Sequence, residues 1–394
     1  MSTSKSASPA PGPSPRARRG VSLSRASRAL HVPSASLAGR GARGVGFAIA
    51  LATSACASVP ISIRGEIEHP VTHDGWALTV EHFAPAPGST ARKRPVVICH
   101  GILSNRHFFE LEGDDSLTMV LARAGFDVWL VDMRGRPDAG APGWFFGKHT
   151  YDYDVDTFAR EDMDAMISYV LAKTRAHDVA WVGHSLGGMI AYARMGAMGE
   201  SRVGALVTIG SPGMFGPASR NSLRFYEASG AIGLLPAFPA QGPAWIDAKL
   251  GLSLAPPILT DTIFQTENIP PATFRAMEQL AVNDASNGEL RQLVRGIRSG
   301  EFTSADGRVS YTQGLSAIHA PTLVIVGRGD EITDPLVGRS VWERLGSSDK
   351  ELLVAGKAEG FSTDFGHVDL LAGPKAHREI FPRIVAWLEE HDGK

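Results

Sequence analysis

The stretch Val182-Gly183-His184-Ser185-Leu186-Gly187-Gly188 decides the fold of this chain. It closes a short apolar run, residues 178–183, that indicates a buried strand, and it leads into a sequence typical of the start of a helix. Gly183 and Gly187 stand two positions before and after Ser185, where a Cβ would collide if strand and helix met closely. The pattern predicts a sharp turn that holds Ser185 in a strained conformation with its hydroxyl exposed.

Ser185 would also stand at the N-terminus of the helix that follows. Unpaired N–H groups and the positive end of the helix dipole favour an oxyanion at such a position. The alternative is an ordinary glycine-rich turn without a chemical role, because a G-x-S-x-G pattern also occurs by chance. A nucleophilic serine, unlike that turn, requires a base and an acid elsewhere in the chain.

Length and composition narrow the classes of function. The chain has 394 residues with 39 basic and 41 acidic side chains, which suits one large catalytic domain with an insertion and argues against a nucleic-acid partner. The two cysteines, Cys56 and Cys99, cannot supply a disulfide framework, and Cys99 lies in an apolar run that predicts a buried side chain. No phosphate loop, dinucleotide fingerprint or metal cluster is visible, so we expect no cofactor and no metal.

Residues 1–64 form a basic tail that has no acidic residue and contains an apolar stretch at 45–55. This stretch is too short to span a bilayer as a helix and suits the core of a signal peptide. Small residues then precede Cys56, an arrangement similar to bacterial lipoprotein signals, in which the cysteine is lipidated after cleavage. We expect export to the cell envelope, as a lipoprotein or as a periplasmic or secreted protein, rather than a cytoplasmic location. The alternative is a buried N-terminal helix.

Beyond the tail, short apolar strands alternate with helical stretches. Strands are expected at 95–99, 126–131, 178–183, 203–209, 321–326 and 351–355. Helices are expected near 114–124, 157–173, 186–198, 334–345 and 375–390. This alternation predicts an α/β fold with a mostly parallel central sheet flanked by helices, and ligands bound at the C-terminal ends of the strands. Ahead of it, the Asp74-Gly75 step between two strand-like runs predicts a hairpin.

The alternation divides the chain into an α/β core at 65–210 and 319–394 and an intervening segment at 211–318. A structureless loop of that length is uncommon in a compact domain, so the segment is predicted to be an inserted, mostly helical cap over the site. Large apolar residues recur in it, among them Phe215, Trp245 and Phe264. Most of them would form the core of the cap itself, and some could line an acyl-binding pocket.

A base and an acid for Ser185 are found where this architecture places them. A serine hydroxyl is a poor nucleophile until a positioned base takes its proton and an acid orients that base. Asp330 follows a strand on a glycine-rich turn, and His367 follows the last strand on a loop. Asp330 would accept the Nδ1–H of His367, which leaves Nε2 to take the proton of Ser185. Glu331 and Asp334 are rival acids, and Asp330 could instead only cap the next turn.

Two backbone N–H groups are expected to form an oxyanion hole. Leu186 supplies one because it follows the nucleophile, and Ile102 supplies the other from the loop after the strand at 95–99. Gly101 allows the backbone to approach the substrate closely. His100 is expected to be structural rather than catalytic, because a second base would have no proton to take.

These motifs together resemble the α/β-hydrolase superfamily, and within it the acid lipases of the lysosomal and gastric type and their bacterial relatives. The motifs are HGILSN at 100–105, LARAGFDVWLVDMRG at 121–135, YDYDVDTFAREDMDAMISYV at 151–170, GHSLGG at 183–188, GRGD at 327–330 and GHVDLLAG at 366–373. The chain order Ser185, Asp330, His367 is also the order of that superfamily. The lipase group often has Gln after the nucleophile, where this chain has Leu186.

The resemblance implies a serine hydrolase that cleaves carboxylic esters, an esterase or lipase, through an acyl-enzyme intermediate. Its substrate would be a small-molecule or lipid ester, and a lipidated Cys56 would anchor it to a membrane. An acyltransferase, or a hydrolase of amides, lactones or polyesters with the same triad, is the alternative. A non-catalytic envelope protein that keeps the fold for binding agrees less well with the complete set of three side chains.

Overall fold

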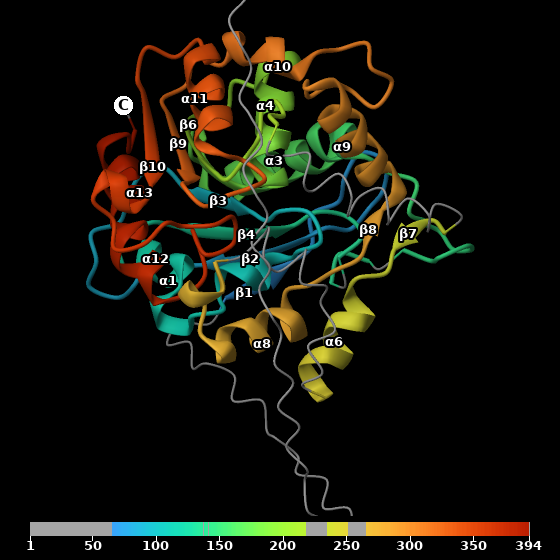
Figure 1. The fold of residues 1–394 in the computed structure, drawn as a ribbon, viewed down its shortest axis with the longest axis horizontal. Helices are drawn as coiled ribbons and strands as arrows, with labels where there is room; N and C mark the ends of the chain where they lie inside the picture. The colour runs from blue at the N-terminus through green and yellow to red at the C-terminus, as the bar shows by residue number, and fades with distance from the viewer. Residues whose placement is uncertain (1–64, 137, 141, 218–234, 251–264, 394) are drawn as a thin grey trace, which may run out of the picture. The chain divides into compact units, whose positions relative to one another are not determined.

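The computed structural model describes residues 65–136, 138–140, 142–217, 235–250 and 265–393 (Figure 1). Its centre is an eight-stranded sheet with the order β1-β2-β4-β3-β5-β6-β9-β10. The strands are β1 (Glu66–Glu68), β2 (Thr79–Phe83), β3 (Val96–Cys99), β4 (Val128–Asp132), β5 (Val179–His184), β6 (Val203–Ile209), β9 (Thr322–Gly327) and β10 (Lys350–Ala355). β2 is antiparallel to β1 and β4, and all other neighbouring strands of this sheet are parallel. The predicted α/β fold with a mostly parallel central sheet is confirmed.

The strands at the centre of the sheet are buried on both faces because their sequences are apolar throughout. Every residue of β3 and β5 is buried. Cys99, the last residue of β3, pairs with Gly183, the penultimate residue of β5. The chain therefore leaves the two strands side by side, at His100 and at Ser185, so the two loops expected to form the site begin at adjacent strand ends.

Helices cover both faces of the sheet (Figure 1). They are α1 (Leu117–Arg123), α2 (Val155–Thr157), α3 (Met163–Thr174), α4 (Leu186–Ala197), α11 (Pro335–Arg344), α12 (Pro374–Glu379) and α13 (Phe381–Glu390). Alternate side chains of β3 point into opposite layers. Val97 and Cys99 belong to the hydrophobic cluster that includes side chains of α3, α4 and α11, whereas Val96 and Ile98 belong to the cluster with α1, α12 and α13.

Two predicted helices differ in detail from the structure. The prediction of a single helix near 375–390 is wrong, because α12 and α13 are separate helices. Pro382 lies in the first turn of α13, and a proline ring in a continuous helix would clash with the preceding turn. The helix expected near 157–173 contains a wider π turn at Phe158–Asp162 before α3 begins. The hairpin predicted at Asp74-Gly75 is confirmed by antiparallel pairing of β1 with β2.

Helices occupy much of the described chain between β6 and β9. They are α6 (Gln241–Leu250), α8 (Pro271–Leu280), α9 (Asn287–Ser299) and α10 (Tyr311–Gly314), beside a small sheet of β7 (Ala237–Phe238) and β8 (Ala285–Ser286). Phe215 is buried and packs where Gly296 of α9 leaves room for its ring. Trp245 on α6 is half exposed, and Phe264 lies outside the described residues. The cap boundaries at 211–318 remain a prediction.

The N-terminal tail, with the apolar stretch at 45–55 and Cys56, lies outside the described residues. Cys99 is fully buried, as expected, and burial raises the pKa of its thiol far above the ordinary value. In the part of the chain that the structure describes, no helix combines the length and apolar character needed to cross a membrane.

Candidate active site

Ser185 lies at a strained turn between β5 and α4. Its φ of 50° and ψ of −116° fall in a region that side-chain-bearing residues rarely adopt. Backbone hydrogen bonds hold it there. The Ser185 N–H donates to the Ile209 carbonyl at 2.8 Å, and the Ser185 carbonyl accepts from Gly188 and Met189, both at 3.1 Å. The strained turn predicted from the glycine pattern is confirmed, whereas the exposed hydroxyl is not, because Ser185 is buried.

Gly183 and Gly187 make this turn possible through close backbone contacts. A Cβ at Gly183 would lie 2.4 Å from the backbone of Gly187, and a Cβ at Gly187 would lie 2.3 Å from the carbonyl oxygen of Cys99. Backbone atoms cannot move aside as a flexible side chain can. The two glycines therefore allow α4 to begin directly against β3 and β5.

Asp330 and His367 form a buried, hydrogen-bonded pair. His367 Nδ1 lies 2.9 Å from Asp330 Oδ2, and both side chains are almost fully buried. The other carboxylate oxygen accepts the backbone N–H groups of Ile332 and Thr333, each at 2.8 Å. Because a carboxylate accepts hydrogen bonds, Nδ1 carries the proton and Nε2 is left as the acceptor.

The rival acids are placed differently. Asp334 Oδ1 accepts the N–H groups of Leu336 and Val337 at 2.8 and 2.9 Å, so it caps the N-terminus of α11. Glu331 is exposed at the surface. Of the three acids considered from the sequence, Asp330 is the one bonded to His367.

His184 connects the histidine loop to the turn that carries Ser185. Its Nε2 donates to the His367 carbonyl at 3.1 Å, and the two imidazole rings have centroids 4.9 Å apart. His367 therefore lies next to the residue that precedes the nucleophile candidate. Among the described residues, the Ser185 hydroxyl makes no hydrogen bond to His367. Catalytic hydrogen bonds are often long without substrate and shorten when it binds.

The ring of His184 remains uncharged. Burial, and next the neighbouring His367, lower its pKa to about 3. A neutral His184 places no positive charge beside His367, where it would oppose protonation of the base. This contact is absent from the sequence-based prediction, because the two histidines are 183 positions apart.

The loop after β3, residues 100–105, lies against the same turn. A Cβ at Gly101 would lie 3.0 Å from the Ser185 Cβ, so the two loops are in close contact. Leu186 is the first residue of α4, and its N–H therefore has no acceptor within the helix. The Ile102 N–H makes no hydrogen bond with another described residue. Both groups predicted for the oxyanion hole are thus on segments that meet at Ser185.

His100 holds the start of this loop. It is fully buried, its Nδ1 donates to the Gly101 carbonyl at 2.8 Å, and its Nε2 accepts the Met133 N–H at 3.3 Å. Burial, and next the charge of Arg136, keep its pKa well below the ordinary value. Both ring nitrogens are therefore used in backbone contacts, which agrees with the structural role expected from the sequence.

A buried ion pair that the sequence did not reveal fixes the far end of the loop. The backbone N–H of Arg106 donates to Asp132 Oδ1 at 2.7 Å, and its guanidinium donates to Oδ2 at 2.6 Å. Both side chains are buried. A hydrogen-bonded pair with both partners satisfied restrains the loop, whereas one buried charge alone would be costly.

The loop is also tied to the chain between β6 and β9. Arg136 Nε donates to the Ser104 carbonyl at 2.8 Å, and Arg136 Nη1 lies 3.6 Å from Oε1 of Glu289 on α9. Both charged side chains are fully buried. The Leu103 carbonyl accepts the N–H of Asn283 at 2.9 Å. Burial raises the pKa of Glu289 to about 7, so this connection contains a group that titrates near neutrality.

The sequence matches the family described as alpha/beta hydrolase fold over residues 94–366, and the chain belongs to this family. Lipase 3 of Drosophila melanogaster is 23% identical over 356 residues, which cover 82% of this chain and 89% of that protein. Human gastric triacylglycerol lipase is 30% identical over 128 residues, which cover 31% of this chain and 32% of that protein. The predicted resemblance to acid lipases is confirmed.

The fold is also found among solved structures. A monoacylglycerol lipase from Paleococcus ferrophilus superposes with a TM-score of 0.54 and 18% identity, and the match covers 80% of this chain and 99% of that one. At this level of identity, the likeness concerns the fold.

Proposed function

We propose that this protein is a serine esterase or lipase that cleaves carboxylic esters through an acyl-enzyme intermediate. The observation that carries the proposal is the strained Ser185, whose neighbour His184 packs against His367 of the buried pair with Asp330. An ordinary glycine-rich turn needs neither an imidazole nor a carboxylate nearby. The similarity to proteins named as lipases supports the same reaction class.

The proposed reaction begins with attack of Ser185 Oγ on the ester carbonyl carbon. His367 Nε2 takes the hydroxyl proton, and Asp330 stabilises the resulting imidazolium through Nδ1–H. The negative charge moves to the carbonyl oxygen, where the N–H groups of Ile102 and Leu186 stabilise it. The ester C–O bond then breaks, and His367 gives its proton to the leaving alcohol.

Water completes the cycle. His367 Nε2 takes a proton from water as the water oxygen attacks the acyl carbon. The bond to Ser185 Oγ breaks, the acid is released, and the serine recovers its proton from His367. Asp330 and His367 are both buried, which keeps bulk water away from the Asp330 side of the pair.

A hydrolysis profile across p-nitrophenyl esters of increasing acyl length tests the proposal. The wild type should hydrolyse part of the series, and Ser185→Ala should hydrolyse none of it above background. Product analysis with an added alcohol separates hydrolysis from the alternative of acyl transfer, and amide, lactone and polyester substrates separate the remaining ones. A folded wild type inactive on all of these substrates would favour a non-catalytic binding role.

We also propose export to the cell envelope with lipidation of Cys56. The basic tail, the short apolar stretch at 45–55 and the small residues ahead of Cys56 support this. Mass spectrometry of the protein from its native cells should find Cys56 as an N-terminal, lipid-modified residue. An intact tail in that material would contradict the proposal.

A further inference from the structure

The loop between β4 and α2 ends in an exposed aromatic tip. Phe145 is 61% exposed and Phe146 is 90% exposed. The base of this loop is closed, because the Gly143 N–H donates to the His149 carbonyl at 3.0 Å and Gly143 pairs with Thr150 in a β-bridge. The two phenylalanines therefore sit on a defined turn, which we call the aromatic loop, residues 143–150.

Such a tip is unusual on a protein surface. Single exposed apolar residues are common on protein surfaces. Two adjacent exposed phenylalanine side chains form a contiguous apolar patch, and neither of them gains the free energy of burial. Glycine at position 143 fits this closure, since a Cβ there would lie 1.8 Å from the Phe146 carbonyl oxygen. The turn itself therefore presents Phe145 and Phe146 to the outside.

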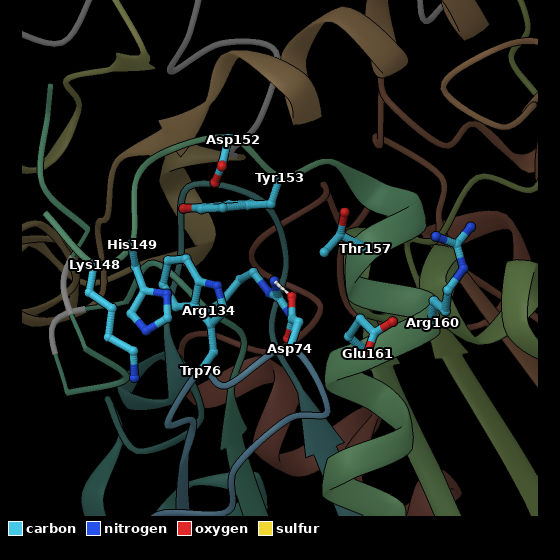
Figure 2. A pocket seen from close by; sticks show the side chains of 10 residues that line it. All are labelled: Asp74, Trp76, Arg134, Lys148, His149, Asp152, Tyr153, Thr157, Arg160 and Glu161. Carbon is cyan, nitrogen blue, oxygen red and sulfur yellow. Dashed lines mark hydrogen bonds and ion pairs between the residues drawn. The ribbon is translucent and has the colours of Figure 1, made fainter. Parts of the chain in front are cut away.

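A charged hollow with a volume of about 410 Å³ lies beside this loop, and Lys148 and His149 of the loop line it. Figure 2 shows Lys148, His149 and Trp76 on one side of the hollow and residues of the helical segment after β4 on the other. Three acidic and three basic side chains line it: Asp74, Asp152, Glu161, Arg134, Lys148 and Arg160.

Part of this charge is already paired within the protein. Arg134 binds Asp74 at 2.6 Å and Asp162 at 2.7 Å. Among the described residues, the other four charged side chains of the hollow form no ion pair: Lys148, Asp152, Arg160 and Glu161. Two positive and two negative side chains of the hollow therefore remain without an ion-pair partner in the described part of the chain. Because their charges sum to zero, they suit a zwitterionic partner better than a strongly charged one.

We propose that the aromatic loop docks this protein on the surface of a lipid bilayer or droplet with zwitterionic headgroups. Phe145 and Phe146 would enter the boundary of the acyl region, and Lys148 would meet the headgroup phosphates while its stem lies along apolar surface. The inference rests on the proposed function, because a docked esterase or lipase meets its water-insoluble substrate at that surface.

A protein partner agrees less well with the size of the tip. A stable protein interface buries about 800 Å² on each partner. Two phenylalanine side chains supply about 500 Å² at most. An exposed aromatic tip followed by a lysine instead has the features of an interfacial anchor, which needs apolar insertion and a cation at headgroup level.

Sedimentation with phosphatidylcholine vesicles tests the proposal in full-length protein. All variants carry Cys56→Ala, so that a lipid on that residue cannot hold the chain on the vesicle. The double change Phe145→Ala and Phe146→Ala should weaken binding by about tenfold or more, while hydrolysis of soluble p-nitrophenyl butyrate stays unchanged. Leu336→Ala is the matched control, because Leu336 is 73% exposed on α11 and should not alter binding.

Ser185→Ala separates this inference from the proposed function. This variant should bind vesicles as strongly as the protein with the intact serine and should hydrolyse no ester. Vesicle binding can therefore be interpreted even if the protein proves to have no esterase activity. Unchanged vesicle binding in the double phenylalanine variant would overturn the proposal. Loss of binding in Trp245→Ala with the double variant unaffected would also overturn it, since it would place the docking surface on α6. Binding only to vesicles rich in phosphatidylglycerol would contradict the zwitterionic partner.

Discussion

His367 Nδ1 lies 2.9 Å from Asp330 Oδ2, although the two residues are 37 positions apart in the chain. The sheet accounts for this contact. β9 and β10 are parallel neighbours, with Val326 opposite Val354, so the loops that leave their C-terminal ends begin side by side. Asp330 lies on the first loop and His367 on the second. The pairing of strands thus places an acid and a base at the same edge as Ser185.

Replacing Asp330 with asparagine tests the role of this contact. An amide cannot hold Nδ1 as a donor with the same strength, so the imidazole can take the tautomer that no longer accepts the serine proton. We expect kcat to fall by about 10⁴-fold. The measurement is kcat on a soluble p-nitrophenyl ester, with the fold checked by circular dichroism.

Asp334→Ala is the matched control for that change. Asp334 caps α11, so its loss should lower the free energy of unfolding by about 1 kcal/mol and leave kcat nearly unchanged. If Asp334→Ala removed activity while Asp330→Asn kept it, the acid would be assigned to the wrong residue.

Gly187→Ala tests the close approach of α4 to β3. Its Cβ would lie 2.3 Å from the Cys99 carbonyl oxygen, which forces backbone to move. We expect a loss of about 1–3 kcal/mol in the free energy of unfolding, together with a large loss of kcat because the turn at Ser185 shifts. Urea unfolding and the ester assay measure the two effects.

Gly242→Ala provides the comparison for a harmless glycine substitution. Gly242 lies in α6, and a Cβ there meets no atom within 4 Å. Gly242 is in the first turn, directly before Pro243, so the gain in helix propensity is offset by the restriction that a proline places on the preceding residue. The free energy of unfolding should therefore change by less than about 0.5 kcal/mol, and activity should stay the same. Equal behaviour of the two alanine variants would show that the predicted contact at Gly187 has no consequence.

The stability of the protein should depend on pH through Glu289. Burial raises its pKa from 4.5 to about 7 in the folded state. Between these two pH values the folded form holds a proton that the unfolded chain has already lost. The contribution of Glu289 to the free energy of unfolding is therefore fully present below pH 4.5 and is lost as pH rises to about 7. The size of this decline is as much as about 3 kcal/mol.

Glu289→Gln should remove this part of the pH dependence, because glutamine does not titrate. Urea unfolding at pH 5 and pH 8 gives the difference for each protein. Glu278 on α8 also has a raised pKa of about 7, caused first by burial and next by Asp247, so some decline should remain in the variant. An identical decline in wild type and Glu289→Gln would rule out Glu289 as its source.

Local patterns account for what the sequence predicts well. Each feature that is predicted well can be recognised from a few neighbouring residues. These features are the apolar strands, the glycines around Ser185 and the turns that carry Asp330 and His367. Chain order then indicates how these pieces meet, because parallel strands end at one edge of the sheet. The break before α13 could also have been expected, since Pro382 is visible in the sequence.

Contacts between distant residues account for what the sequence does not predict. Nothing near Asp132 indicates that Arg106 will neutralise it, or that Glu289 will approach Arg136 inside the protein. These pairs form because charges buried by the fold need partners, and the choice of partner depends on three-dimensional packing. Periodicity and local motifs contain no information of that kind.

Labelling with a fluorophosphonate, followed by peptide mapping, tests the central claim most directly. Such a compound phosphonylates a serine whose hydroxyl is activated by a neighbouring base. The account predicts modification of the wild type at Ser185, strongly reduced labelling in His367→Ala, and none in Ser185→Ala. A folded wild type that stays unlabelled, or that is labelled at a different residue, would contradict it.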